Sequence, residues 1–130
     1  MKFDDKIPIY YQIKTHLYHE MLTGKLKPGE KLPAVRQLAV DLTVNVNTVQ
    51  RALTEMMAEK AIISQRGKGN FVTADQAQLA KLKEQLVMTQ LAQVYEQLHG
   101  LNLTDTEIIA SLKRYIEKRE AQPDVKSIND

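Results

Sequence analysis

The chain has 130 residues, of which 43% are hydrophobic and 26% charged, and this fits one small domain or a small domain with an appendage. It has no cysteine and no run of about 18 apolar residues, which excludes disulfides, thiolate metal sites and a membrane-spanning helix. Residues 1–73 carry 11 Lys and Arg against 7 Asp and Glu, whereas residues 74–130 carry 7 against 9, an asymmetry that favours a nucleic-acid module followed by an oligomerisation segment.

The amino-terminal segment predicts a helix from about Pro8 to Gly24. Proline is favoured in the first turn of a helix and glycine just after the last. The apolar residues between them recur every three or four positions, namely Tyr10, Ile13, Leu17 and Met21. Acids near the start of the chain, where a signal peptide would carry a basic and then an apolar run, lead us to expect a cytoplasmic protein.

Two shorter helices follow, with a very short link between them. Pro33 precedes a helical apolar period over residues 34–42, and a second period starts at Val49. Asn47 is a residue type that caps helices, so we expect the third helix to begin there. Because only four or five residues join the two helices, they must cross steeply, which predicts a helix-turn-helix.

The sequence period then changes. "AIISQRGKGNFVTA", residues 61–74, contains two β-prone runs around a polar turn with Gly67 and Gly69, which predicts a small β-hairpin. Helix, short helix, tight turn, helix and hairpin is the order of a winged helix-turn-helix.

Two more helices are expected after residue 74. The second of them begins with Thr104 and Glu107 at the spacing of a capping box. Their apolar residues form a nearly continuous strip: Leu79, Leu82, Leu86, Leu91, Val94, Leu98, Ile108, Leu112, Tyr115 and Ile116. A pair of helices of about 40 residues cannot bury such a strip alone, so we expect a homodimer. The alternative is that the pair folds back on the front domain.

The expected fold is therefore mainly α with a small β-wing. An N-terminal winged helix-turn-helix DNA-binding domain spans residues 1–73, a C-terminal two-helix dimerisation region spans residues 74–120, and residues 121–130 form a flexible tail.

Residues 8–72 resemble the DNA-binding domain of the bacterial GntR family of transcription regulators. The similarity combines "PGEKLP" before the second helix, "RQLA" within it, "NTVQRAL" in the third helix and "GKGNFV" in the hairpin. The short C-terminal part with two helices is similar to the YtrA-type branch of that family. The resemblance implies a sequence-specific DNA-binding regulator, namely a dimeric repressor of a transporter-type operon that binds an inverted-repeat operator in double-stranded DNA.

The start of the third helix provides the candidate base contacts. Thr48 can donate to a phosphate or meet a thymine methyl, Gln50 can pair with an adenine, and Arg51 can reach a phosphate or a guanine. Asn47 either caps the helix or contacts DNA, and Val46 either touches a thymine methyl or packs inward. Better-known branches of the family carry arginines in place of Val46 and Gln50, so the operator sequence cannot be transferred from them.

Phosphate contacts are expected from the second helix and the hairpin tip. Arg36 matches the family arginine that contacts backbone phosphate. Arg66, Lys68 and Gly69 form the tip, where glycine lets the backbone approach DNA closely.

Other chemistry finds little support in the sequence. His16 and His19 have no third ligand nearby in the sequence, and no serine lies in a catalytic motif. We expect no enzyme, no cofactor, no metal and no membrane partner, and the sequence leaves open any small-molecule effector. The alternative function is a winged-helix module for protein–protein assembly, which would show exposed aromatic or aliphatic anchors on the third helix.

Overall fold

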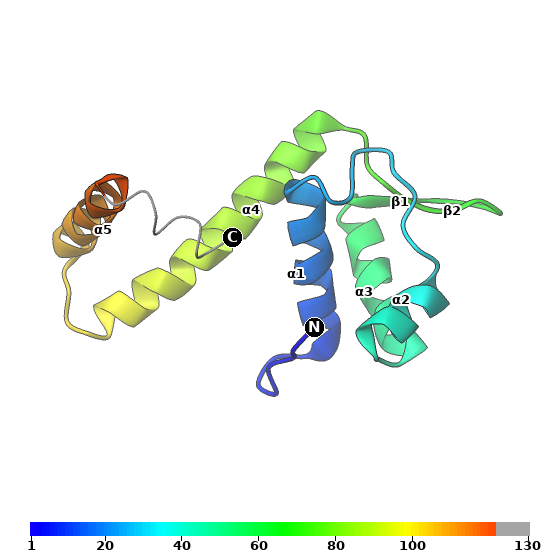
Figure 1. Cartoon of the computed structure of the whole chain (residues 1–130), viewed down its shortest axis with the longest axis horizontal. Helices are drawn as coiled ribbons and strands as arrows, with labels where there is room; N and C mark the ends of the chain where they lie inside the picture. The colour runs from blue at the N-terminus through cyan, green and yellow to red at the C-terminus, as the bar shows by residue number, and fades with distance from the viewer. Residues whose placement is uncertain (122–130) are drawn as a thin grey trace. The chain divides into compact units, whose positions relative to one another are not determined.

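The computed structural model describes residues 1–121, which form five helices and one two-stranded sheet (Figure 1). The elements are α1 (Ile9–Leu22), α2 (Val35–Leu42), α3 (Val46–Ala58), β1 (Ile62–Gln65), β2 (Gly69–Val72), α4 (Gln76–His99) and α5 (Asp105–Glu120). The chain divides into two compact units, Met1–Glu84 and Gln85–Asp130. Apart from Ala121, the predicted tail of residues 121–130 lies outside the described residues.

The turn between α2 and α3 consists of Thr43, Val44 and Asn45 alone. Thr43 ends α2 with a φ of 57°, a left-handed conformation that is uncommon for a β-branched residue. The backbone N–H of Val44 then donates to the carbonyl of Ala39 at 3.0 Å. This tight left-handed turn produces the predicted helix-turn-helix.

Asn45, and not Asn47, is the N-cap of α3. The Asn45 side-chain oxygen accepts the backbone N–H of Asn47 at 2.7 Å, and the helix begins at Val46. The predicted start at Asn47 is therefore wrong by one residue, and the capping role assigned to Asn47 belongs to Asn45. Both positions carry the same good capping residue, so the cap is decided by the turn that precedes it.

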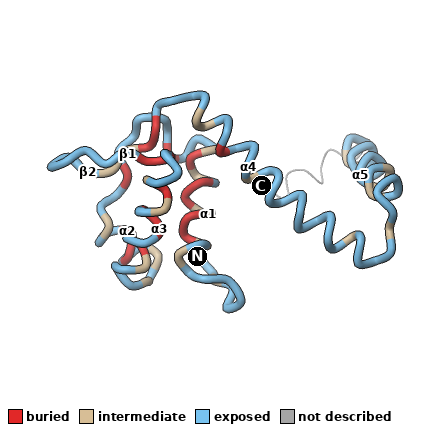
Figure 2. Tube along the Cα trace, turned by 180° about the vertical axis from the view of Figure 1, so that it is seen from behind, coloured by how far each residue is buried: buried red, intermediate tan, exposed pale blue. Residues whose placement is uncertain are grey.

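The first unit is built around a core shared by α1, α2, α3 and the hairpin. Figure 2 shows the buried residues concentrated on these elements. The largest fully buried side chains are Ile13, Leu17, Val49, Leu53, Met56 and Val72. Burying each one stabilises the fold by roughly 1.5–3 kcal/mol relative to exposure. On α3 these residues occupy one face and leave the opposite face to solvent.

The hairpin is fastened to the connector that precedes α2. Strands β1 and β2 are antiparallel, with Ile62 opposite Val72 and Gln65 opposite Gly69. On the other edge of β2, Leu32 donates its N–H to Asn70 at 2.8 Å, and Val72 donates to Glu30 at 2.8 Å. These bonds cover the edge of β2 with the connector and so fix the base of the wing.

The first part of α4 belongs to the first unit. Leu82 is buried and Leu79 is half-buried against the core of that unit. Both were assigned from the sequence to the dimerisation strip, but they pack within the chain. The strip that remains begins at Leu86.

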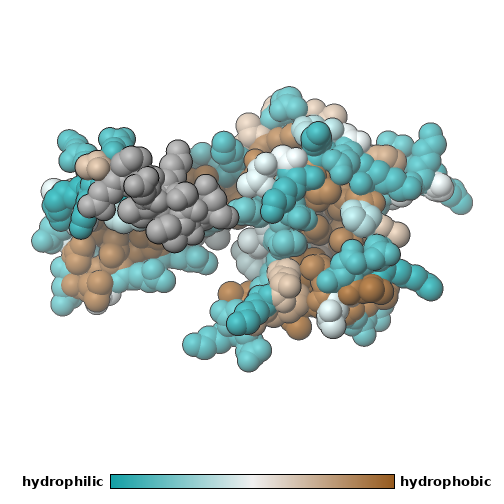
Figure 3. Space-filling view, viewed as in Figure 1, coloured by the Kyte–Doolittle hydropathy of each residue, from teal (hydrophilic) through white to brown (hydrophobic). Residues whose placement is uncertain are grey.

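The second unit is a pair of helices without a core of its own. Helix α5 begins with the predicted capping box, in which Thr104 and Glu107 exchange side-chain-to-backbone hydrogen bonds at 3.2 and 2.9 Å. Tyr95 donates its hydroxyl to Asp105 at 3.0 Å and so joins α4 to the start of α5. No described residue from Gln85 onwards is buried, and apolar side chains are visible at the surface in Figure 3. The expected mainly helical winged fold with two C-terminal helices is confirmed.

Candidate nucleic-acid interface

The exposed face of α3 carries most of the predicted base contacts. Val46, Asn47 and Gln50 are exposed, while Thr48 is half-buried beside the core-facing Val49. Gln50 donates its side-chain amide to Thr54, one turn later, at 3.3 Å. Within residues 1–121 the side-chain amide of Asn47 makes no hydrogen bond, whereas its backbone N–H is bonded to Asn45. The start of α3 thus exposes two side-chain amides and one valine side chain beside the positive end of the helix dipole, which attracts anions.

Val46 faces solvent, with an exposed fraction of 42%. The two interpretations left open by the sequence were contact with a thymine methyl and inward packing. Its exposure leaves the side chain available to a partner.

Arg51 has partners within the protein. Its guanidinium carbon lies 3.8 Å from the centre of the Tyr10 ring, and its Nε lies 3.9 Å from a carboxylate oxygen of Glu55. The side chain is nevertheless 64% exposed. Arg51 therefore lies on the side of α3 that faces α1, where it forms a cation–π contact with Tyr10. The sequence had predicted only a core-packing role for Tyr10.

The basic residues of α2 and the wing are accessible. Arg36, in the first turn of α2, is exposed and forms no ion pair within residues 1–121. Arg66 and Lys68 are exposed at the turn between β1 and β2. The Lys68 N–H donates to the Gln65 carbonyl at 2.8 Å and closes that turn.

The backbone conformation at position 69 favours glycine, independently of any contact with DNA. Its φ is +117°, and a Cβ at this position would lie 2.8 Å from Cε of Lys31. The Lys31 side chain thus covers the Gly69 backbone, where the sequence suggested an approach of DNA. The backbone of Lys31 also forms an antiparallel β-bridge with Phe71, and its side chain adds one more cation to the wing. The sequence treated Lys31 only as diffuse charge, and no local pattern reveals its place against the wing.

A buried lysine fixes α3 against α1. The Lys14 ammonium lies 3.0 Å from Glu55 and 3.3 Å from Glu59, and Glu59 also accepts the hydroxyl of Tyr18. Burial lowers the pKa of Lys14, but the hydrogen bond to Glu55 and the charge of Glu59 outweigh it, so the pKa lies above its ordinary value. Burial, and then the hydrogen bond to Glu59, raise the pKa of Tyr18. Lys14 is therefore charged and structural at neutral pH.

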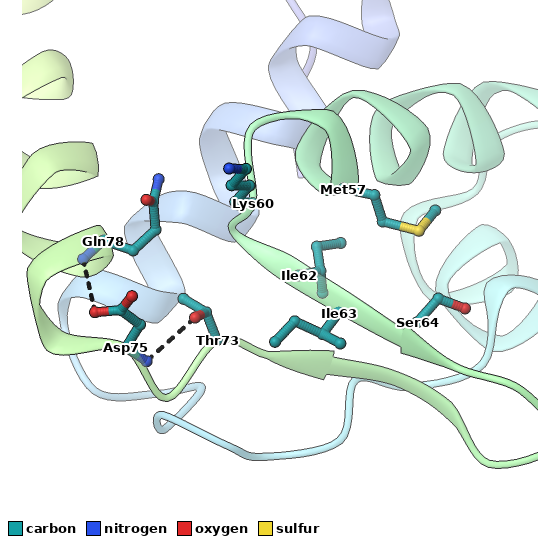
Figure 4. A pocket seen from close by; sticks show the side chains of 8 residues that line it. All are labelled: Met57, Lys60, Ile62, Ile63, Ser64, Thr73, Asp75 and Gln78. Atoms are coloured by element: carbon teal, nitrogen blue, oxygen red, sulfur yellow. Dashed lines mark hydrogen bonds between the residues drawn. The ribbon is translucent and has the colours of Figure 1, made fainter.

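One pocket of the first unit lies beside β1 (Figure 4). It has a volume of about 440 Å³ and is lined by Met57, Lys60, Ile62, Ile63, Ser64, Thr73, Asp75 and Gln78. The Asp75 carboxylate accepts the backbone N–H groups of Ala77 and Gln78 at the start of α4. The Asp75 side chain therefore caps the start of α4.

The described residues offer little for metal or membrane chemistry. His16 lies 3.7 Å from Glu20, and no group of three or more His, Cys, Asp or Glu in residues 1–121 is arranged to hold a metal ion. None of the helices in this range is long and apolar enough to cross a membrane.

The fold is a winged helix-turn-helix that exposes side-chain amides on α3 and cations on α2 and the wing. This combination is typical of a DNA-binding transcriptional regulator. The profile of bacterial regulatory proteins of the gntR family matches residues 9–72. The chain is 33% identical over 116 residues to the HTH-type transcriptional regulator YhcF of Bacillus subtilis, covering 89% of this chain and 96% of YhcF. The chain therefore belongs to the GntR family of bacterial transcriptional regulators.

Two further comparisons concern the short architecture. The HTH-type transcriptional repressor YtrA of Bacillus subtilis is 38% identical over 85 residues, which cover 61% of this chain and 65% of YtrA. A GntR family transcriptional regulator from Listeria monocytogenes has a solved structure with a TM-score of 0.78 and 34% identity, covering 86% of this chain and 98% of that one. The chain is a short, YtrA-type member of the family.

Proposed function

We propose that the chain is a homodimeric repressor that binds an inverted-repeat operator in double-stranded DNA. Residues 1–73 would contact DNA and residues 74–120 would hold the two copies together. Similarity to YtrA, which is described as a repressor, supports the direction of regulation. A transporter-type operon as the target rests on the resemblance to the YtrA branch.

The observation that carries the DNA role is the exposed polar face of α3 flanked by free cations. Asn47, Thr48 and Gln50 lie at the end of α3 that a recognition helix presents to base edges, and Val46 offers a methyl contact. Amides and methyl groups in this position favour A·T pairs. Arg36, Arg66 and Lys68 supply phosphate contacts, and Lys31 strengthens the field of the wing.

The dimer is supported by the unburied apolar surface of the second unit. A groove of about 420 Å³ lies between α4 and α5. The exposed large apolar residues on these helices are Val87, Met88, Leu91, Val94, Tyr95, Ile109, Leu112, Tyr115 and Ile116. Exposed apolar surface of this extent marks an interaction site, and a second copy with the same surface is complementary to it. Two-fold symmetry then presents two identical recognition helices, which is why the operator should be an inverted repeat.

Operator selection from a random duplex library, followed by substitution, tests the proposal. Gln50→Ala should weaken binding to the selected operator by about 1–3 kcal/mol and relax the preference at one base pair in each half-site. Arg36→Ala should weaken binding to the operator and to random DNA alike, because a phosphate contact carries no sequence information. Lys118→Ala, which removes an equal charge from the exposed surface of α5, is the matched control.

Salt dependence separates the DNA role from an assembly role. Arg36, Arg66 and Lys68 from two subunits neutralise about six phosphates, so these residues alone should give a slope of log K against log salt of about −5. A slope near zero, with no sequence enriched by the selection, would leave the protein–protein assembly module as the better explanation.

A further inference from the structure

We propose that Tyr10 is a positioning residue that holds the Arg51 guanidinium ready to bind a DNA phosphate beside α3. The proposal rests on the proposed function, because it assigns Arg51 to the backbone of the bound DNA. It adds a residue of α1 to the machinery that the sequence placed on α2, α3 and the wing.

The contacts of Arg51 occupy one face and one edge of its guanidinium. The Tyr10 ring covers a face at 3.8 Å from the ring centre to Cζ, a stacking distance. Glu55 approaches the Nε edge at 3.9 Å. The terminal nitrogens make no hydrogen bond within residues 1–121, and the side chain is 64% exposed. These nitrogens form the planar donor pair that binds phosphate oxygens.

Tyr10 is itself held in place. It is half-buried and packs against the core of the first unit. Two residues later, the Gln12 amide accepts the N–H of Asp4 at 2.8 Å and donates to the carbonyls of Asp4 and Ile7 at 2.7 and 2.8 Å. These bonds fasten the segment before α1 to its first turn, so the ring that supports Arg51 stands on an ordered part of the fold.

The stacking changes the cost of binding DNA. An unsupported arginine samples many rotamers and loses that freedom when it contacts a phosphate. An arginine already stacked on a fixed ring loses less, so the same contact yields a higher affinity. The interaction is independent of the Tyr10 hydroxyl, for which no hydrogen bond is formed within residues 1–121.

Binding of the full chain to a mixed-sequence duplex of about 30 base pairs, long enough for two half-sites one turn apart, tests the role. Tyr10→Leu should weaken binding about 4- to 25-fold in the dimer, which is the product of an about 2- to 5-fold effect of an exposed cation–π pair at each of two sites. The slope of log K against log salt should change little, because Arg51 keeps its charge and still neutralises the phosphate. Tyr10→Phe should restore the affinity.

Controls separate positioning from folding. Tyr11→Leu alters the neighbouring exposed tyrosine, whose ring lies 5.3 Å from the Lys14 ammonium, and should leave affinity and slope unchanged. Arg51→Lys keeps the charge but removes the flat stacking group, so it should lose affinity as Tyr10→Leu does while the slope of log K against log salt stays unchanged. This variant decides the question even if Tyr10→Leu fails to fold, because wild-type binding by Arg51→Lys would overturn the proposal.

The double variant distinguishes this inference from the proposed function. If Arg51→Ala weakens binding and Tyr10→Leu adds nothing in that background, the ring acts through Arg51. If Arg51→Ala weakens binding and Tyr10→Leu alone has no effect, the positioning role is wrong and the DNA role stands. If Arg51→Ala and Arg36→Ala both leave binding unchanged, the proposed DNA interface itself fails.

Discussion

The two asparagines at the start of α3 have different roles, and exchanging each for alanine should separate them. Asn45 accepts a backbone N–H at 2.7 Å, and losing such a cap costs about 1 kcal/mol. For a unit of the size of Met1–Glu84, this lowers Tm by about 4–8 °C. The exposed amide of Asn47 has no partner within residues 1–121, so Asn47→Ala should change stability by less than about 0.5 kcal/mol.

For DNA binding, we expect Asn47→Ala to have a larger effect than Asn45→Ala. Asn47→Ala should weaken binding to a selected operator by about 1–3 kcal/mol if its amide contacts a base. Thermal unfolding followed by circular dichroism gives the stability, and fluorescence anisotropy with a labelled operator duplex gives the affinity. Asn45→Asp is the control for stability, since aspartate also caps helices and complements the helix dipole. An Asn47→Ala protein that loses as much stability as Asn45→Ala would refute the assignment of the cap.

Three further outcomes follow from the structure. Leu112→Glu, at a position that is 51% exposed, should give a monomer in sedimentation equilibrium. The control Val40→Glu, at a position on α2 that is 72% exposed, should remain dimeric. A dimer in both cases would contradict the proposed dimer interface. Gly69→Ala should destabilise the protein by about 1–3 kcal/mol in thermal unfolding, because an alanine is strained at a φ of +117°. Adding Lys31→Ala should recover part of this loss, since it removes the 2.8 Å contact between the new Cβ and Cε of Lys31. If no stability is recovered, the whole loss comes from the strained backbone. The backbone N–H of Thr104 donates to Glu107 and lowers the pKa of that carboxyl below 4.5. The stability that Glu107 gives to the start of α5 is therefore present above pH 4.5 and is lost as the pH falls through the lowered pKa of the folded chain. Helicity measured by circular dichroism should show this acid-dependent loss in the unaltered chain but not in Glu107→Gln.

Local patterns in the sequence were enough for the elements and their order. The helical period of Ile13, Leu17 and Met21 predicted α1, and Gly67 and Gly69 marked the hairpin turn. The capping box at Thr104 is equally local, because both hydrogen bonds join residues three apart. The motifs that resemble the GntR family lie within this same local information, and the family match over residues 9–72 confirms them.

The sequence could not decide between equivalent local choices. Asn45 and Asn47 are the same residue type two positions apart, and the left-handed Thr43 determined which of them became the cap. Leu79 and Leu82 continue the periodic strip of α4, but whether they face a core or a partner depends on what packs against each turn of the helix.

What the sequence alone determined is therefore the winged helix-turn-helix and the two following helices. Each of these depends on propensities and periods that act within a few residues. Only the tertiary structure decided that Arg51 stacks on Tyr10, that Lys31 covers Gly69 and that Leu82 belongs to the first unit. Those contacts join residues far apart in the chain, and they arise when packed elements bring together side chains that no local spacing relates.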